Sequence, residues 1–350
     1  MRSQGGAAHI WLAGGLAAAL VAGCSDALER TTPVGQEIVV LNAQTASLTL
    51  VNAGDFTVTS LPLVVPAPAA HTLAGEAQAV LVPTGSADAV QVLTLGGSGR
   101  SVALAPGSGA TGASFQDDTL AWVANPGLNT ITELNVRTGD TLRSLSVGPR
   151  PTAVAVVAGA VFSVNSNTSG DTVHGPSTLT AWRTDGSGSP DTVPLTGVDA
   201  EAVVVGDDSL LYVVERGDSG QADGRVSVVD PVARREAVVI NGLGERPGPA
   251  VFHHAGRLLV ASPSEGILEI DALTRSVVRG PGAGVKPQGQ GVVALALDAR
   301  GRVYAVTDAG CAAAPGTLYV LSPPPNYGVI TSAPLGHCPV AATVAELPPQ

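Results

Sequence analysis

The stretch Leu120–Val156, which reads LAWVANPGLNTITELNVRTGDTLRSLSVGPRPTAVAV, decides the fold of this chain. Its apolar or alternating segments are 122–125, 129–135, 142–147 and 153–156. Short segments of this kind, separated by turn formers such as Thr138-Gly139 and Gly148-Pro149, are typical of strands joined by tight turns. The stretch therefore predicts a small antiparallel β-sheet that leads directly into the next one.

The same unit returns along the rest of the chain at a regular period. Its second strands begin near Ile38, Ala79, Leu120, Val161, Leu210, Leu258 and Val303, at intervals of 41, 41, 41, 49, 48 and 45 residues. Its third strands follow at 47–51, 89–95, 130–134, 179–182, 225–229, 267–270 and 317–321. A period of about 40 to 50 residues suits one four-stranded propeller blade. We therefore predict an all-β fold, a seven-bladed β-propeller of four-stranded blades that spans residues 37–350.

The best unit resembles the YVTN-type β-propeller repeat. That repeat has an aromatic-Val-x-Asn strand, matched here by Trp122 to Asn125, and an Asn-Thr strand, matched by Asn129 and Thr130. A Thr-Gly turn and a proline-containing turn into the innermost strand complete the match. The other units keep the period but match the sequence pattern of the YVTN repeat less closely. The resemblance implies the propeller fold, and this fold by itself settles no function.

The C-terminal tail supplies a strand that the first blade lacks. The chain between Cys24 and Ile38 is too short for both a tether and an inner strand, whereas 340–345 reads VAATVA and resembles the inner strands at 153–157 and 292–297. We predict that this tail pairs with Ile38–Leu41 and closes the ring. Such an exchange removes the exposed strand edge at the seam.

The N-terminus predicts an export signal and a lipid anchor. Residues 1–23 carry one charge, Arg2, and then the apolar run 10–21, which is short for a membrane span of about 20 residues. The letters Val21-Ala22-Gly23-Cys24 resemble a bacterial lipobox, in which the cysteine thiol takes a diacylglycerol. This resemblance implies a lipoprotein signal peptide over 1–23, lipidation at Cys24 and a tether over 24–36. An ordinary cleaved signal with a free cysteine is the alternative.

An acylated Cys24 makes the membrane one expected partner and places the protein in the bacterial cell envelope. Ser25 follows the cysteine, so the aspartate retention signal of enterobacterial lipoproteins is absent from that position. We therefore expect the outer membrane or the cell surface rather than the cytoplasm.

Charge and aromatic content exclude several other partners. The 18 basic and 29 acidic residues give a net charge of −11, and Lys286 is the only lysine, so no face for nucleic-acid phosphates is expected. Only Trp122 and Trp182 remain after the signal, at strand positions that core packing explains. This argues against the tryptophan-rich quinone-cofactor propellers and against surfaces that stack on bases or sugars.

The two cysteines beyond the signal predict a disulfide. Cys311 follows the second strand of the seventh blade, and Cys338 follows its fourth strand, so both loops emerge on the same side of the ring. An exported chain meets an oxidising compartment, which favours a Cys311–Cys338 bridge. Two unrelated buried thiols are the alternative.

One face of the ring carries the candidate ligand-binding residues. In a propeller of this strand order, the loops after the second and the fourth strands open on one face, and function usually lies there. The candidates on these loops are Asn125, Asn129, Arg150, Asn165, Glu201, Arg246, Gln290 and His337. The competing interpretation is that such residues only satisfy the backbone groups of turns.

The sequence predicts no catalytic residue, no metal site and no cofactor. It contains no His-Glu-x-x-His and no Cys-x-x-Cys, and the loop with Asp218 and Asp223 lacks the inner ligand positions of a calcium loop. A calcium site remains an alternative, because gluconolactonase-like propellers hold calcium with Glu, Asn and Asp. The residues available for that role here are Asn165, Glu201 and Asp308.

Two functions remain after these exclusions. The first is a non-enzymatic binding or scaffold module on a membrane-anchored lipoprotein, whose partner is an envelope protein or polymer. The alternative is a lactonase-like hydrolase, with or without calcium, whose site lies at the central channel. The sequence contains every residue type that the first function requires, so we favour the binding module.

Overall fold

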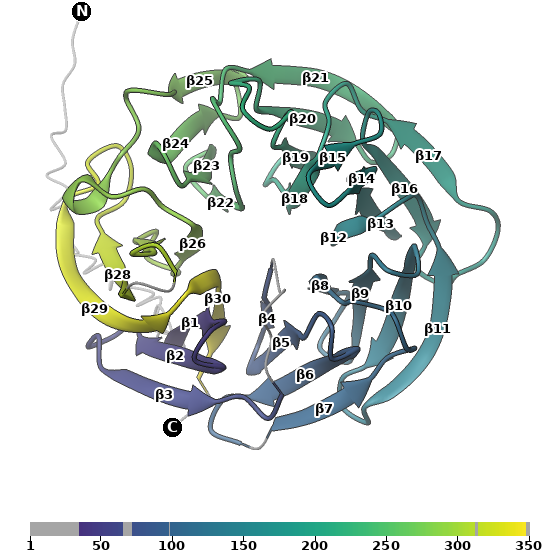
Figure 1. The fold of residues 1–350 in the computed structure, drawn as a ribbon, viewed down its shortest axis with the longest axis horizontal. Helices are drawn as coiled ribbons and strands as arrows, with labels where there is room; N and C mark the ends of the chain where they lie inside the picture. The colour runs from purple at the N-terminus through teal and green to yellow at the C-terminus, as the bar shows by residue number, and fades with distance from the viewer. Residues whose placement is uncertain (1–34, 66–71, 98, 312–313, 348–350) are drawn as a thin grey trace, which may run out of the picture. The chain divides into compact units, whose positions relative to one another are not determined.

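The computed structural model describes residues 35–65, 72–97, 99–311 and 314–347. Within these ranges the chain forms seven four-stranded antiparallel sheets, arranged as blades around a central channel (Figure 1). The predicted all-β, seven-bladed propeller is confirmed. The signal peptide and Cys24 lie outside the described residues. No described helix is long and apolar enough to span a membrane.

Each blade runs from an inner strand outward. Blade 1 has β30 (Pro339–Glu346), β1 (Gln36–Asn42), β2 (Ser47–Asn52) and β3 (Val58–Pro62), and blade 2 has β4 (Ala74–Glu76), β5 (Ala79–Pro83), β6 (Ala89–Thr94) and β7 (Gly99–Ala103). Blade 3 has β8 (Gly112–Phe115), β9 (Leu120–Asn125), β10 (Thr130–Asn135) and β11 (Asp140–Ser146). Blade 4 has β12 (Pro151–Val157), β13 (Ala160–Asn165), β16 (Thr178–Arg183) and β17 (Asp191–Pro194).

The remaining blades follow the same order. Blade 5 has β18 (Ala200–Val205), β19 (Leu211–Glu215), β20 (Arg225–Asp230) and β21 (Arg235–Asn241), and blade 6 has β22 (Ala250–His253), β23 (Arg257–Ser262), β24 (Gly266–Asp271) and β25 (Ser276–Arg279). Blade 7 has β26 (Ala294–Leu297), β27 (Val303–Thr307), β28 (Pro315–Leu321) and β29 (Val329–His337). A small hairpin, β14 (Thr168–Ser169) and β15 (Thr172–Val173), and a 3-10 turn at Pro287–Gly289 lie in connections.

The second and third strands are apolar on both sides because neighbouring blades cover both faces of each sheet. In β13, for example, Phe162 is fully buried and packs in one cluster with Leu179 of β16 and with Leu211 of the next blade. The outer strand β11 is largely exposed instead. This arrangement explains why strand positions could be read from continuous apolar runs.

The ring closes as predicted. β30 pairs with β1 in an antiparallel register that sets Ile38 opposite Val344 and Leu41 opposite Ala341. The pairing begins at Gln36, opposite Glu346, one residue before the expected start of the propeller. The last strand in the sequence is thus the inner strand of the first blade.

The connections divide between two faces. The loop face holds the loops from second to third strands and those from each outer strand to the next inner strand. On it, Ala43 N after β1 donates to Cys338 O after β29 at 2.8 Å. The turn face holds the remaining tight turns, and there Ala53 N after β2 donates to Gln36 O at 2.8 Å.

Candidate binding pocket on the loop face

The connections into the inner strands adopt left-handed backbone at related positions. Arg150 before β12, Asp199 before β18 and Arg246 before β22 have φ values of 52°, 51° and 47°. Residues with a Cβ adopt this conformation infrequently, and glycine or asparagine are the usual choices. Charged side chains thus occupy a left-handed backbone position in the connections into three consecutive blades.

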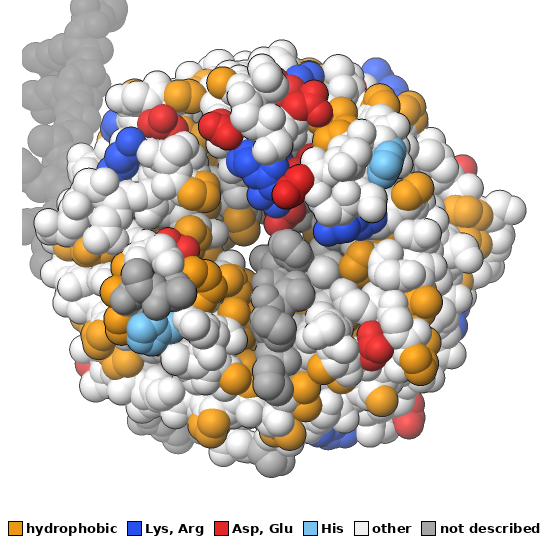
Figure 2. Space-filling view, in the orientation of Figure 1, with side chains coloured by type: hydrophobic (Ala, Val, Ile, Leu, Met, Phe, Trp, Pro, Cys, Tyr) orange, Lys and Arg blue, Asp and Glu red, His pale blue; other side chains and the backbone are white. Residues whose placement is uncertain are grey.

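These three residues line one pocket at the mouth of the channel. The pocket has a volume of about 280 Å³, and its charged residues are Arg150, Asp171, Asp199, Glu201, Arg216 and Arg246. Hydroxyl groups of Thr111, Thr152, Ser166 and Thr168 complete the polar lining. Figure 2 shows this face, on which basic and acidic side chains meet beside the central opening.

Arg216 lies at the centre of the charged group. It directly follows β19, and its backbone N–H donates to Asp199 O at 3.0 Å, which fixes the loop before β18. Its Nη1 donates to Glu201 Oε2 at 3.1 Å, and its Nε lies 3.8 Å from Asp199 Oδ2. Burial raises the pKa of the Asp199 carboxyl, against the opposing effect of Arg216. Arg216 thus hydrogen-bonds to Glu201 and forms a longer ion pair with Asp199.

The other two guanidinium groups make no hydrogen bond to a carboxylate of the described residues. Arg246 Nη2 is 3.8 Å from Asp199 Oδ2, which is beyond a hydrogen bond. The Arg150 guanidinium has no ion-pair partner within 4.0 Å in the described part of the chain. A guanidinium presents a planar fork of donors that matches a carboxylate or a phosphate. The arrangement can therefore bind an anionic group.

A second cavity lies among the inner strands, with a volume of about 340 Å³. Most of its lining is aliphatic or aromatic, as with Ala202, Phe252, Leu295 and Val344. It offers a ligand little hydrogen bonding, so we assign the candidate site to the charged pocket.

Three of the predicted ligand-face residues, Arg150, Glu201 and Arg246, line this pocket. Asn129 is exposed beside it, and its Oδ1 accepts a hydrogen bond from Arg150 N at 2.8 Å. Asn129 therefore supports the loop that carries Arg150.

Asn125 and Asn165 do not belong to the ligand face, contrary to the prediction. Asn125 is 1% exposed, and Asn165 is fully buried. Asn125 Nδ2 donates to Thr132 Oγ1 at 2.9 Å, and Asn165 Nδ2 donates to Thr180 Oγ1 at 3.0 Å. In both blades the side-chain amide turns into the sheet and joins the second strand to the third.

Gln290 and His337 lie on the loop face outside the pocket. Gln290 is exposed after the 3-10 turn, and His337 is half-buried at the end of β29. Sequence reasoning missed Arg216 as a binding residue. Its one signal was its position directly after a second strand, which places a residue on the loop face.

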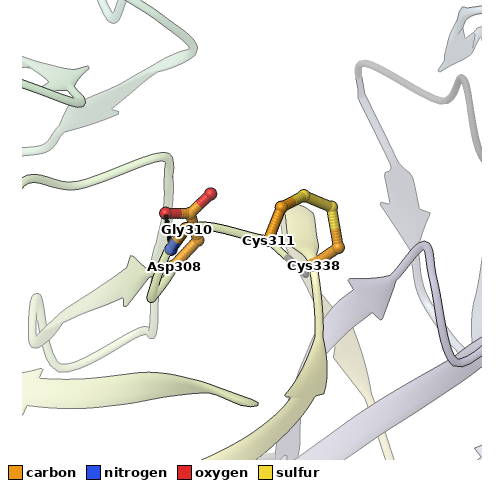
Figure 3. Close-up of a disulfide and its surroundings, with 4 residues drawn as sticks. All are labelled: Asp308, Gly310, Cys311 and Cys338. Carbon is orange, nitrogen blue, oxygen red and sulfur yellow. Dashed lines mark hydrogen bonds between the residues drawn. A yellow bond between two sulfur atoms is a disulfide. The ribbon is translucent and has the colours of Figure 1, made fainter. Parts of the chain in front are cut away.

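Cys311 and Cys338 form the predicted disulfide on the loop face (Figure 3). The bridge joins the loop after β27 to the connection into β30, so it fastens blade 7 beside the closure strand. Asp308 lies in the first of these loops, where its Oδ1 accepts a hydrogen bond from Gly310 N at 3.1 Å.

The three residues considered for calcium do not share a pocket. Glu201 lines the charged pocket, whereas neither Asn165 nor Asp308 does. Over the described ranges, no group of three or more His, Cys, Asp or Glu residues could hold a metal ion. Glu201 is paired with Arg216 instead.

Fold and site together define a seven-bladed β-propeller with a charged pocket on its loop face. No protein-family model and no curated protein matches the chain. Hydrazine synthase from Kuenenia stuttgartiensis is similar in structure, with a TM-score of 0.64 and 10% identity, over 79% of this chain and 89% of that chain.

Two other solved structures are similar to this chain. A functionally unknown protein from Desulfotomaculum acetoxidans has a TM-score of 0.65 and 11% identity, over 89% of this chain and 99% of that one. Virginiamycin B lyase from Staphylococcus aureus has a TM-score of 0.62 and 13% identity, over 77% and 88%. Identities this low show the shared fold alone.

Proposed function

We propose that this chain is an exported lipoprotein of the YVTN-repeat type, anchored through an acylated Cys24, whose propeller binds an anionic group of an envelope protein or polymer. The loop-face pocket is the binding site. The Val21-Ala22-Gly23-Cys24 sequence supports the anchor, and the period of the blades supports the repeat.

One observation carries the binding site. Arg150 and Arg246 both line the pocket, and neither guanidinium donates a hydrogen bond to a described carboxylate, although Arg246 forms a long ion pair with Asp199 at 3.8 Å. Arg216 donates a hydrogen bond to Glu201 at 3.1 Å, and Asp199 lies 3.8 Å from both Arg216 and Arg246. In a ligand that carries a carboxylate beside hydroxyl or amino groups, the carboxylate would contact the arginines and the hydroxyl or amino groups would contact the acidic residues.

The pocket supports binding better than catalysis. The hydroxyls of Ser166 and Thr168 form a hydrogen bond with each other at 3.0 Å, and none of the described residues that line the pocket is a histidine. A nucleophilic hydroxyl needs an adjacent general base. The lactonase-like alternative has no specific observation in its favour.

Removal of both ligand-facing guanidiniums should abolish tight binding. Arg150→Gln together with Arg246→Gln removes two charge-assisted contacts of about 1.5 to 3 kcal/mol each, so affinity should fall more than about a hundredfold. The probes are carboxylate-bearing muropeptides and a glutamate-rich peptide, followed by fluorescence polarisation. Arg183→Gln is the matched control, because Arg183 is 69% exposed on the turn face beside Asp185. Equal affinity of the double variant and the control for every probe would refute the site.

Lipidation at Cys24 predicts a mature N-terminus that carries a diacylglycerol. Mass spectrometry of the protein extracted from membranes should find this adduct on Cys24, and Cys24→Ala should release the chain from the detergent phase. An unmodified N-terminus at another residue contradicts the anchor but leaves the pocket untouched.

A further inference from the structure

Two apolar side chains project from the turn face. Leu273, between β24 and β25, is 90% exposed, and Val232, between β20 and β21, is 79% exposed. They are the most exposed large hydrophobic residues of the described chain. Both turns join the third strand of a blade to its outer strand, so both side chains lie on the turn face. The two blades are neighbours in the ring.

The two turns share a structure that holds these side chains outward. Asp230 Oδ1 accepts the backbone N–H of Val232 at 2.9 Å, and Asp271 Oδ1 accepts that of Thr274 at 2.8 Å. Both turns end in a left-handed arginine, Arg234 and Arg275, each with φ of 54°. The exposure of Val232 and Leu273 is therefore a property of two well-braced turns.

Basic side chains accompany the apolar ones. Arg235 is exposed beside Val232, and Arg275 has no ion-pair partner within 4.0 Å among the described residues. The carboxylates of Asp230 and Asp271, in the same two turns, reduce the local positive charge, so apolar contact contributes more than electrostatic attraction. Apolar side chains flanked by arginine are suited to the interfacial layer of a membrane.

The described chain also begins on the turn face. Gln36 O accepts Ala53 N, and Gln36 Oε1 accepts Ala299 N at 2.7 Å, both within turns of this face. The eleven residues 24–34 precede the first described residue, Gly35. A chain of this length extends at most about 40 Å. An acyl group on Cys24 would therefore tether the propeller within about 40 Å of the bilayer, through an attachment on the turn face.

We propose that the turn face rests on the lipid surface, with Leu273 and Val232 in the headgroup layer and the charged pocket directed away from the membrane. This inference rests on the lipid anchor of the proposed function. Two side chains bind weakly by themselves, but the anchor raises their effective concentration at the bilayer. The pocket then faces partners that lie outside the membrane.

Site-specific fluorescence tests this orientation. The acylated full-length protein is reconstituted into phosphatidylethanolamine and phosphatidylglycerol vesicles that contain a spin-labelled lipid. An NBD fluorophore is attached to Leu273→Cys or Val232→Cys, and Leu128→Cys is the control because Leu128 is 40% exposed on the loop face. We expect a blue shift and about twofold quenching at the first two sites, and neither effect at the control.

A second variant tests whether the side chains of Leu273 and Val232 themselves hold the turn face against the lipid. Leu273→Ser together with Val232→Ser should leave the thermal midpoint unchanged, because both side chains are exposed. Quenching of a fluorophore on Thr274→Cys should fall in this background to the level of the Leu128→Cys control.

The outcomes separate the anchor from the orientation. A protein that floats with the vesicles but shows no quenching at Leu273→Cys and Val232→Cys retains its anchor and overturns this inference. Equal quenching at all three sites overturns it as well. A blue shift that requires no lipid and grows with protein concentration indicates a second copy of the chain instead. A protein that does not float refutes the anchor, and the inference with it.

Discussion

Glu215, at the end of β19, takes the place that asparagine holds at the ends of β1, β9 and β13. It is fully buried, and Ser227 Oγ lies 2.8 Å from its Oε2 and 2.6 Å from Glu236 Oε1. A hydroxyl has one proton to donate, so the pair of contacts is complete only when one carboxyl is protonated. Burial raises the pKa of Glu215 to about 7, with the Ser227 hydrogen bond acting in the opposite direction.

This residue should make stability depend on pH near neutrality. The folded pKa lies above the ordinary value of 4.5, so the folded state binds the extra proton. The stabilisation is complete below about pH 4.5 and is lost as the pH rises through about 7, at a cost of roughly 2 to 4 kcal/mol. Urea unfolding at pH 5 and pH 8 should show this loss in the native protein. Glu215→Gln should remove most of it, whereas the exposed control Glu245→Gln should not; an unchanged pH dependence in Glu215→Gln contradicts the assignment.

At the scale of the strands, the recurrent asparagine joins the second strand of a blade to the third by a side-chain hydrogen bond. Asn42, Asn125 and Asn165 each donate a side-chain hydrogen bond to a threonine of the third strand, at 2.9, 2.9 and 3.0 Å. The asparagine of the repeat pattern is therefore explained by hydrogen bonding inside the blade. It carries no information about a ligand.

Loss of this asparagine–threonine hydrogen bond should destabilise the blade and leave the pocket intact. Asn165→Ala removes the hydrogen bonds to Thr178 and Thr180 and leaves the buried Ser163 hydroxyl without its acceptor, so the free energy of unfolding should fall by about 1 to 3 kcal/mol. Chemical denaturation measures it, with exposed Asn326→Ala as the control. Equal stability of the two variants would show that the amide contributes nothing.

The sequence predicted strands well because burial on both faces makes their apolar runs continuous. It predicted the pocket only in part. Arg150 and Arg246 could be placed on the loop face by counting strands, but the contact of Arg216 with Asp199 and Glu201 depends on how the ends of β18 and β19 meet. The direction of the Asn125 and Asn165 amides, into the sheet, is likewise a property of side-chain packing that no spacing encodes.

At the scale of the whole ring, closure depends on the last strand of the chain. β30 pairs with β1 along its length, and the Cys311–Cys338 disulfide lies beside this seam. Deletion of 339–350 removes the inner strand of blade 1 and exposes the edge of β1.

Truncation should therefore lower the thermal midpoint by many degrees and increase aggregation. The control is deletion of 348–350 alone, which leaves β30 complete. A shortened chain that lacks 339–350 and melts at the native midpoint, by calorimetry, would contradict the role of this strand.

Arginine modification by phenylglyoxal, read residue by residue with mass spectrometry, tests the loop-face pocket most directly. The protein is modified with and without the muropeptide or acidic peptide that binds it. We predict that the ligand slows modification of Arg150 and Arg246 several-fold and leaves Arg183 unaffected, because only the first two face the pocket. Equal modification of Arg150 and Arg246 in the presence of a bound ligand would contradict the assignment of this pocket as the binding site.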